Sequence, residues 1–424
     1  MTGVAPASTG QRLLWFLDHY QSESSINCPL VCRIRGEAGE GRLEAALDRL
    51  VARHESLRTT FDGRGSRLRQ VVHAPARVVV RHERCSAGWS DELVEQLLDA
   101  ELRTPIDPQK GPLRATVWHF GAADHLLCLN LHHLVADSWS CGVLFRELGA
   151  LLEDAPPDLP RVDWQYRDFT DWQDELLTGS ALDRHRAYWQ RQLSGLRTPD
   201  LPVHGGPRTA SGRSEMVEAV VPGEVVDALG AVANSQRTTL FAVVLATYFA
   251  ALHRRCGGHD LAVATMLANR SRPETRFTVG LLANMAMLRV RLPVEPSLAD
   301  IVRKTRSTVR DALRFQELPY QLVPGTGAAR AARTDSVVFQ MMPEPIQQAS
   351  RHDAVQLEGL VPHVGGRFDL ELSVLPCADG LRAMLFHRPE RCDPDWVRGF
   401  LADYVRITSA AARAPYTPIS ALPS

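Results

Sequence analysis

The stretch His132-His133-Leu134-Val135-Ala136-Asp137-Ser138-Trp139-Ser140 is the most informative part of this sequence. It follows the apolar segment 125–131, which predicts a buried strand, and it precedes apolar residues at helical spacing between Val143 and Leu152. The nonapeptide therefore forms a short polar connection between a strand and a helix. Such a connection can hold a base in a fixed orientation, and imidazole is the side chain best matched to proton transfer near neutral pH.

Length and composition limit the possible classes of protein. The chain has 424 residues, which is too long for one ordinary core and favours two domains of about 200 residues. Hydrophobic residues make up 45% and charged residues 23%, as in an ordinary soluble globular protein. The formal net charge is −1, whereas a nucleic-acid-binding protein usually shows a basic excess or a basic stripe. Nucleic acid is therefore not an expected partner.

The cysteines and the N-terminus indicate a cellular environment. The eight cysteines are scattered and include no C-x-x-C pair, so neither a zinc ribbon nor a thioredoxin-like motif is expected. Cys32 and Cys128 lie in apolar segments, and we interpret them as small core residues. The first residues lack the basic start and apolar run of a signal peptide, and the longest apolar stretch, Leu240–Leu252, is shorter than the ~20 residues of a membrane helix. We expect a reduced, cytoplasmic protein that enters no membrane.

Both halves of the chain combine predicted helices with predicted strands. Helices are expected at 43–51, 225–233 and 240–252 and after a capping box formed by Ser297 and Asp300, and strands at the end of 53–61 and at 217–221, 261–268, 286–292 and 368–374. A Pro-rich linker at 154–162 and a second loop at 196–214 flank the expected boundary. We expect one lobe over 1–175 and another over 176–424.

Eight segments, in order over roughly 300 residues, resemble the motifs of the condensation domains of nonribosomal peptide synthetases. His132–Ser140 matches the family's H-H-x-x-x-D-G-W-S except at Ser138, and Arg53–Phe61 matches R-H-E-x-L-R-T-x-F. The other six segments are Ser8–Leu17 (S-x-x-Q…L-W-F-L), Tyr166–Trp172 (Y-x-D-[FY]-x-x-W), Tyr188-Trp189 (Y-W), Ala268–Glu274 (A-N-R-x-R-P-E), Gly280–Met285 (G-x-F-V-N-T) and Gln316–Tyr320 (Q-D-x-P-F).

The resemblance implies a fold, a reaction and partners. The fold would be α/β, with two chloramphenicol-acetyltransferase-like lobes in a V-shaped pseudo-dimer and the active site in a tunnel between them. A peptidyl or acyl carrier protein would bring an acyl thioester on its phosphopantetheine arm, and an amine, sometimes an alcohol, would attack it to give an amide or an ester. The resemblance implies no metal, no nucleotide and no cofactor bound by this chain, because the arm belongs to the carrier protein. A monomer is expected.

The residue chemistry agrees with that reaction. A thioester is already activated, so the protein needs to orient two substrates, manage the proton of the nucleophile and stabilise an oxyanion. We assign the management of the nucleophile's proton to His133, which acts either as a true base or as a group that positions the amine. His132 is interpreted as structural, and Asp137 lies too close to the turn backbone to serve as a second base. The resemblance implies an ion pair between Asp137 and Arg270 that clamps the loop against the other lobe.

Other motif residues have supporting roles. Ser138 replaces the family's usual Gly and is expected to cap the helix, to narrow the donor path or to hydrogen-bond the thioester; Trp139 completes the motif. Asn284 is either a strand-bulge residue or a residue near the tunnel. For Arg58 and its neighbours in 53–58, we favour a structural ion pair over contact with the substrate. Met285, which replaces the family's usual Thr, suggests an unusual substrate or a diverged subtype.

Several alternatives remain open from the sequence. We favour a free-standing condensation enzyme, because the chain starts with Met shortly before the first motif and ends in a typical domain end, although an excised domain is also compatible. One rival is an acyltransferase of the same superfamily that uses acyl-CoA. A second is a catalytically silent domain that recruits partner enzymes; such domains usually lose one His of the pair. Heterocyclisation is disfavoured because its family replaces both His by Asp, whereas epimerisation is harder to exclude.

Overall fold

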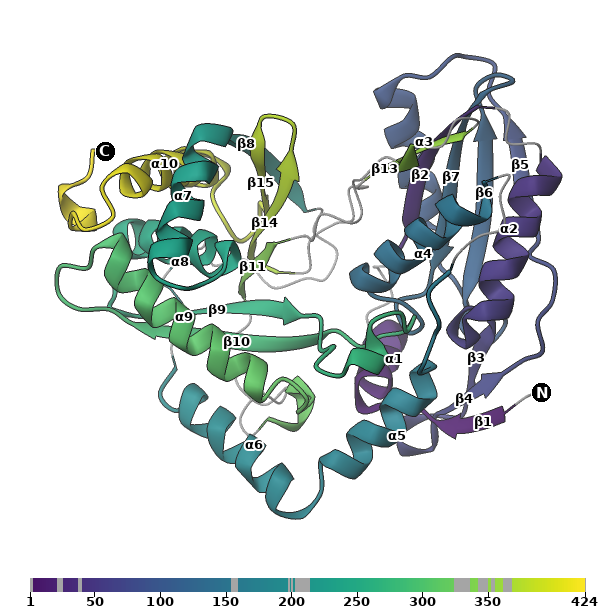
Figure 1. Ribbon diagram of the computed structural model, residues 1–424, viewed down its shortest axis with the longest axis horizontal. Helices are drawn as coiled ribbons and strands as arrows, with labels where there is room; N and C mark the ends of the chain where they lie inside the picture. The colour runs from purple at the N-terminus through teal and green to yellow at the C-terminus, as the bar shows by residue number, and fades with distance from the viewer. Residues whose placement is uncertain are drawn as a thin grey trace. The chain divides into compact units, whose positions relative to one another are not determined.

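The computed structural model describes residues 3–20, 26–36, 40–153, 159–196, 199, 201–202, 214–323, 336–341, 350–351, 355–360 and 368–423. They form two compact units (Figure 1). Unit 1 comprises Met1–Leu176, Arg270–Ala283 and Glu344–Val364, and unit 2 comprises Leu177–Asn269, Asn284–Pro343 and Gly365–Ser424. Two later segments of the sequence thus belong to unit 1, whereas the sequence suggested two contiguous lobes. Parts of both loops that were expected to flank the boundary lie outside the described residues.

Unit 1 is built on a six-stranded sheet with the strand order β12-β13-β2-β7-β6-β5, and β1, β4 and β3 form a smaller sheet. The pairs of β7 with β2 and with β6 are antiparallel, whereas β5 pairs with β6 in parallel. The strands are β1 Gly3–Pro6, β2 Leu30–Gly36, β3 Thr59–Asp62, β4 Arg69–Val72, β5 Val80–Arg84, β6 Leu113–His119, β7 Asp124–Leu131, β12 Ser350–Arg351 and β13 Val355–Leu360. The α-helices are α1 Thr9–Tyr20, α2 Glu40–Arg53, α3 Asp91–Arg103, α4 Ser138–Leu151 and α5 Tyr166–Leu176.

Helices cover both faces of the larger sheet of unit 1. Leu127 and Leu129 of β7 share one apolar core with α2 and α4, whereas Leu126 and Cys128 share a second core with α3 (Figure 1). Because β7 is buried on both faces, its sequence is a nearly continuous apolar run instead of an alternating one. The predicted buried strand before the nonapeptide and the predicted helix after it are confirmed.

Unit 2 carries the other six-stranded sheet, in the order β10-β9-β11-β14-β15-β8. One large core joins this sheet to α7, α8, α9 and α10. The strands are β8 Glu215–Pro222, β9 Asp260–Leu267, β10 Asn284–Arg291, β11 Val337–Met341, β14 Leu370–Cys377 and β15 Gly380–His387. The α-helices are α6 Gly179–Leu193, α7 Gly223–Ser235, α8 Leu240–Cys256, α9 Leu298–Arg314 and α10 Pro394–Arg413.

The mixed fold class predicted from the sequence is confirmed, and so are the expected elements named above. The capping box of α9 is present, since Ser297 Oγ accepts from the Asp300 N–H at 3.2 Å and Asp300 Oδ2 accepts from the Ser297 N–H at 3.1 Å. Within the described ranges, no helix is both long and apolar enough to cross a membrane.

Five of the eight cysteines are buried, including Cys32 and Cys128, which were expected in the core. All eight are free thiols, and burial raises the pKa of Cys32 and of Cys392 to about 12. Burial also raises the pKa of Cys128. These thiols are uncharged at neutral pH and are therefore poor nucleophiles. Across the residues the structure describes, no group of three or more His, Cys, Asp or Glu is arranged to hold a metal ion.

Candidate active site

The loop that carries the nonapeptide is anchored at both ends. At its start, β7 ends at Leu131, His132 forms an isolated bridge with Asn27, and the His133 N–H donates to Ile26 O at 2.9 Å. At its end, α4 begins at Ser138. The apolar stretch 134–136 between them is buried. The loop is thus part of the core of unit 1, which limits the motion of any side chain it carries.

His133 is held in one tautomer by its own turn. Its Nδ1 lies 2.7 Å from Ala136 O, and a carbonyl oxygen can only accept, so Nδ1 must carry a proton. The neutral ring then has its lone pair on Nε2. The side chain is half-buried. An imidazole held in place through Nδ1, whose neutral form has its lone pair on Nε2, suits a proton acceptor.

His132 faces a different environment. Its side chain is 1% exposed, and its Nδ1 accepts a hydrogen bond from the Leu134 N–H at 3.1 Å. Its Nε2 lies 3.5 Å from the Asp18 carboxylate of α1. Both ring nitrogens therefore face groups of the protein itself, which agrees with the structural role expected for this residue.

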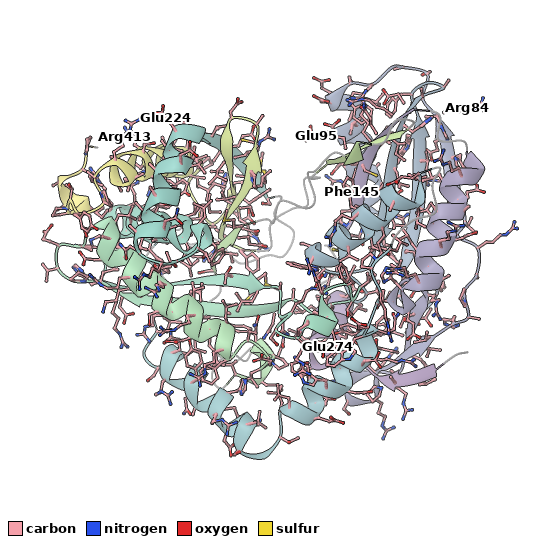
Figure 2. The ribbon with its side chains drawn as sticks, viewed as in Figure 1. Arg84, Glu95, Phe145, Glu224, Glu274 and Arg413 are labelled. Atoms are coloured by element: carbon pink, nitrogen blue, oxygen red, sulfur yellow. The ribbon has the colours of Figure 1, made fainter. Side chains whose placement is uncertain are left out.

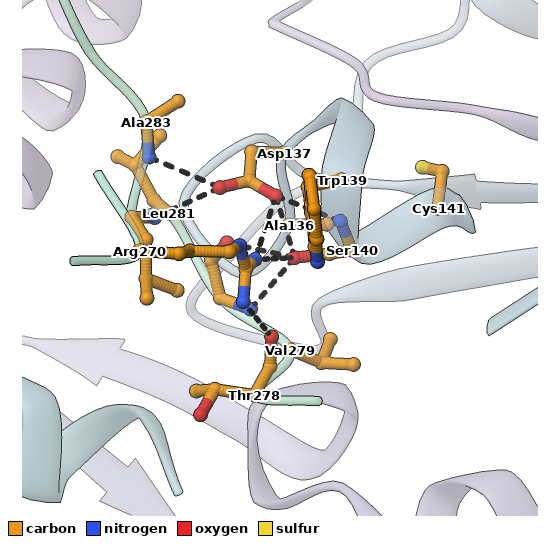
Figure 3. A network of polar contacts seen from close by, with 12 residues as sticks. Ala136, Asp137, Trp139, Ser140, Cys141, Arg270, Thr278, Val279, Leu281 and Ala283 are labelled. Atoms are coloured by element: carbon orange, nitrogen blue, oxygen red, sulfur yellow. Dashed lines mark hydrogen bonds and ion pairs between the residues drawn. The ribbon is translucent and has the colours of Figure 1, made fainter. Parts of the chain in front are cut away.

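Asp137 is the centre of the polar network shown in Figure 3. Its Oδ1 accepts from the Ser140 N–H at 2.8 Å, from Ser140 Oγ at 2.7 Å and from Arg270 Nη2 at 3.2 Å. Its Oδ2 accepts from the N–H groups of Leu282 at 3.1 Å and Ala283 at 3.0 Å. With five donors around a side chain that is 2% exposed, the carboxylate caps α4 and ties it to 282–283. This geometry leaves it no role as a second base.

Arg270 completes the network, and the expected ion pair with Asp137 is present. Nη1 donates to Thr275 O at 2.5 Å and to Thr278 O at 2.7 Å, and Nη2 also contacts Ser140 Oγ at 3.2 Å. Burial lowers the pKa of Arg270 from its usual value, and the Asp137 charge opposes that shift. The segment 270–283 clusters with unit 1, so the clamp closes the loop against a segment of its own unit, not against the second one.

The two residues after Asp137 differ from each other in exposure. Ser138 is the exposed first residue of α4, and Asp137 is the N-cap, so the idea that Ser138 caps the helix is wrong. A carboxylate already occupies the capping position, which leaves the Ser138 side chain pointing outward from the turn. Trp139 donates from Nε1 to Arg276 O at 3.0 Å, and its ring lies 5.6 Å from the Arg270 guanidinium carbon. Trp139 thus supports the clamp.

Gln11 of the first motif reaches the same loop, and Ser8 reaches the 270–283 segment through Tyr166, although neither was predicted as a site residue. Gln11 is 1% exposed, and its Nε2 donates to Leu134 O at 3.0 Å while its Oε1 accepts from the Ser8 N–H at 2.9 Å. Ser8 Oγ lies 2.8 Å from the Tyr166 hydroxyl, which donates to Leu281 O at 3.0 Å. The available signal was the Ser and the Gln that the first motif spaces three residues apart, at the start of α1.

Gly280 explains the close approach of the 270–283 segment to α5. A Cβ at this position would lie 2.1 Å from Tyr166 Cδ2, a distance that no side chain permits. The Gly280 N–H donates to Ser140 Oγ at 3.1 Å. The absence of a side chain therefore lets the segment reach both Tyr166 and the start of α4.

The segment 53–58 forms internal ion pairs, as favoured from the sequence. His54 Nε2 lies 2.7 Å from Glu147 Oε2, and Arg53 Nε donates to the same oxygen at 2.9 Å. Arg58 contacts the Glu55 carboxylate at 3.8 Å and the His73 carbonyl. These contacts join α2 to α4 and hold Arg58 beside the residue that follows β4, which agrees with a structural role.

Asn284 lies in unit 2 and is the first residue of β10, in regular pairing with Leu267. The bulge expected as one alternative is therefore not formed. Its Nδ2 donates to Gln316 O and Leu318 O, both at 2.7 Å, and its Oδ1 accepts from the Tyr320 N–H at 3.0 Å. Asn284 thus fastens the motif 316–320 to the edge of the sheet.

Comparison with known proteins gives the family. The condensation domain family matches residues 1–423, and the chain belongs to this family. It is 31% identical over 99% of its length to part of a linear gramicidin synthase protein from Brevibacillus parabrevis, and 30% identical over 99% of its length to part of cyclosporin synthetase from Tolypocladium inflatum. It covers only 6% and 3% of those two proteins. The chain thus spans less than a tenth of the curated relatives it matches first.

Solved structures show the same fold at low identity. The X-domain from teicoplanin biosynthesis matches with a TM-score of 0.85 and 23% identity, covering 99% of this chain and 97% of that one. The first condensation domain of the calcium-dependent antibiotic synthetase matches with a TM-score of 0.85 and 19% identity, covering 100% and 99%. SgcC5 from Streptomyces globisporus matches with a TM-score of 0.79 and 23% identity, covering 98% and 100%.

Proposed function

We propose that this condensation domain transfers an acyl group from the phosphopantetheine thioester of a carrier protein to an amine, or to a hydroxyl group, and so forms an amide or an ester. The observation that carries the proposal is the fixed tautomer of His133, whose Nδ1 donates to Ala136 O. Membership of the family and the similarity to parts of peptide synthetases support the donor class. The tunnel implied by the family resemblance remains a prediction.

The proposed reaction balances without a further co-reactant. The amine nitrogen attacks the thioester carbonyl carbon, and His133 Nε2 either accepts a proton from that nitrogen or orients it by accepting a hydrogen bond. The tetrahedral intermediate then breaks its C–S bond. The proton passes to the departing sulfur, so the products are an amide and the free thiol of the carrier arm. An alcohol acceptor gives an ester by the same steps.

Asp137 and His132 serve this reaction as positioning residues. Asp137 is saturated by donors from Ser140, Arg270 and the 282–283 backbone, and His132 faces Asp18 and the Leu134 N–H. Both fix the ends of the turn in which His133 lies. Their loss would move the imidazole, and a displacement of about 1 Å can cost 10²-fold in rate.

A second candidate function is recruitment of a partner enzyme. An X-domain of the same fold is known in complex with OxyB from teicoplanin biosynthesis, so this fold also serves as a protein-binding platform. The pair His132-His133 favours the transferase, because recruitment domains of this superfamily usually lose one of these residues. The rival with an acyl-CoA donor differs from the main proposal only in the source of the pantetheine thioester.

Intact-protein mass spectrometry tests the proposal directly. A carrier protein loaded with an acyl group is incubated with a panel of amines and alcohols and with the wild type, His133→Ala or Ser138→Gly. Ser138→Gly is the matched control, because it restores the residue usual for the family at an exposed position of the same motif. We expect acyl loss that depends on an acceptor, falls at least about 10²-fold in His133→Ala and persists in Ser138→Gly.

The same assay separates the rivals. Transfer from acyl-CoA but not from any loaded carrier protein would favour the CoA-dependent enzyme. Absence of transfer from both donors, together with unchanged product formation by a pathway that contains His133→Ala, would favour the recruitment domain. The mass of the product distinguishes an amide from an ester.

A further inference from the structure

One exposed helix face in unit 2 is strongly cationic. Of the residues of α9, the exposed ones are Arg303, Lys304, Arg306, Ser307, Arg310, Leu313 and Arg314. Five of these are cationic and none is acidic. The chain as a whole carries 48 Lys and Arg against 49 Asp and Glu. The face of α9 is therefore a local concentration of charge and does not reflect the average composition.

Three of the five cations have a partner within the unit, and two have no carboxylate partner there. Arg303 pairs with Asp300, Arg310 lies 3.2 Å from the neighbouring Asp311, and Arg306 Nη1 donates to Gln236 O at 2.9 Å. Lys304 and Arg314 have no carboxylate within 4.0 Å among the residues of the described ranges. Surface ion pairs of this kind contribute at most about 1 kcal/mol each. Contacts within unit 2 therefore account for three of the five cations and leave Lys304 and Arg314 open to a partner.

The α9 face also has an exposed apolar side chain and a hollow. Leu313 is 44% exposed and lies one helical turn from Arg310, so an apolar side chain is surrounded by cations. Near the start of the helix, a hollow of about 430 Å³ is lined by Arg291, Leu292, Pro293, Asp300, Arg303 and Lys304. The face thus offers one apolar contact point at one end and a cationic hollow at the other.

We propose that this face of α9 docks the carrier protein, through a carrier surface that is acidic around one apolar side chain. The inference rests on the proposed function for the identity of the partner. Complementary charge steers association and selects the partner. An apolar centre within a charged rim is the anatomy of a protein–protein interface, which favours a protein over a nucleic acid. From Arg303 to Arg314 the face is about 17 Å long at 1.5 Å per residue, which matches one short partner helix.

A second copy of this chain is the main competing occupant. The exposed face of α3 carries Asp91, Glu92, Glu95 and Asp99 against Arg103, and Figure 2 labels Glu95 there. A contact between α3 of one copy and α9 of the next would be heterologous, and such contacts produce rings or open chains. Self-association is therefore measured in the test.

The test compares two charge-reversal variants of the full chain. Lys304→Glu/Arg314→Glu changes the α9 face, and Arg64→Glu/Arg67→Glu is the matched control in unit 1, since both positions are exposed. Both doubles change the formal charge by the same amount. The probe is a panel of carrier proteins with a fluorescent acyl-phosphopantetheine arm, and the readouts are the Kd from fluorescence anisotropy at low and high salt and the rate of transfer from a free acyl-pantetheine thioester.

We expect the α9 double to raise the Kd at least tenfold at low salt, the control to change it less than twofold, and transfer from acyl-pantetheine to stay at the wild-type rate in both. Equal Kd values for wild type and the α9 double, equal weakening by both doubles, or no carrier protein bound by the wild type would overturn the proposal. Salt-sensitive self-association that disappears in the α9 double would assign the face to a second copy. The proposed function fails separately, if no His133-dependent transfer occurs from the free thioester.

Discussion

Asp137 in unit 1 and Asn284 in unit 2 each hold a motif segment in place, but with different chemistry. Each uses one short side chain to fasten a motif segment through backbone hydrogen bonds. Asp137 is a buried charge that only accepts, from Ser140, Arg270 and the 282–283 backbone. Asn284 is neutral and both donates, to Gln316 O and Leu318 O, and accepts, from Tyr320.

The two side chains differ because the segments they hold present different backbone groups. The N-terminus of α4 presents N–H donors and a positive dipole end, so a carboxylate is the suitable cap. Its burial then requires Arg270 as a counter-charge. The segment 316–320 presents two carbonyls and one N–H, which an amide matches and a carboxylate does not. The loop of His133 therefore depends on a charge pair, and the motif in unit 2 does not.

Asp137→Ala should have the largest effect of any single change at these two centres. Removing one partner of a buried pair leaves Arg270 uncompensated, and we expect the free energy of unfolding to fall by about 3–5 kcal/mol in urea denaturation. Arg270→Met should cost a similar amount. Because each single change already breaks the same pair, the double variant should lose clearly less than the sum of the two. Additive losses would contradict a coupled clamp.

Asn284→Ala should have the next largest effect. It leaves the carbonyls of Gln316 and Leu318 and the Tyr320 N–H without their partner, and the loss of such backbone hydrogen bonds to one side chain costs about 1–3 kcal/mol in total where the freed groups are partly rehydrated. We expect a loss in this range in the same denaturation assay. Asn284→Asp should not rescue it at neutral pH, because a carboxylate cannot donate. Rescue by Asp would show that shape, not donor chemistry, is what the position needs. Ser307→Ala, exposed on α9, is the control and should stay within about 0.5 kcal/mol.

Gln11→Leu tests whether the clamp alone positions His133. The variant removes the donor to Leu134 O, and we expect a loss of about 1 kcal/mol in stability. Because Gln11 acts through the loop backbone, kcat for acyl transfer should fall while KM for the acceptor stays constant. Recovery of kcat by Gln11→Asn is not expected, since the shorter side chain does not span the distance. A change in KM alone would place Gln11 in substrate binding and would remove it from the positioning residues.

Much of this arrangement was predictable from the sequence, for physical reasons. The buried strand and helix around 132–140 follow from local periodicity, and the capping box of α9 follows from Ser297 and Asp300. The Asp137–Arg270 pair was expected only from the family resemblance, because nothing local relates residues 133 positions apart. The structure places it within unit 1, which the sequence did not indicate.

Other features depend on long-range packing. Ser138 has the chemistry of a helix cap, yet Asp137 has already taken the cap position. The roles of Gln11 and Gly280 require knowledge of which backbone atoms meet them, Leu134 O for the first and Tyr166 for the second. The charge of the α9 face was readable from the sequence only once the buried side of the helix was known.

The smallest predicted effect concerns pH and is confined to unit 2. The segment that Asn284 fastens also carries Glu317, whose Oε2 lies 3.3 Å from His185 Nε2 on α6. This hydrogen bond raises the pKa of His185 above its ordinary value of 6.5, and burial and Arg184 oppose the shift. A raised pKa in the folded state means that protonated His185 stabilises the fold. That contribution is fully present below pH 6.5 and is lost as the pH rises through the raised pKa.

Glu317→Gln should therefore reduce the free energy of unfolding by at most about 1 kcal/mol at pH 5.5, and by less at pH 8.5, where a smaller fraction of wild-type His185 is protonated. The measurement is urea denaturation of both proteins at the two pH values. His185→Phe with Glu317→Gln is the control, because a chain without the titrating imidazole should show no pH-dependent difference from His185→Phe alone. An equal loss at both pH values would show that the pair acts as a neutral hydrogen bond. The segment 316–320 of unit 2 would then be held by uncharged groups alone.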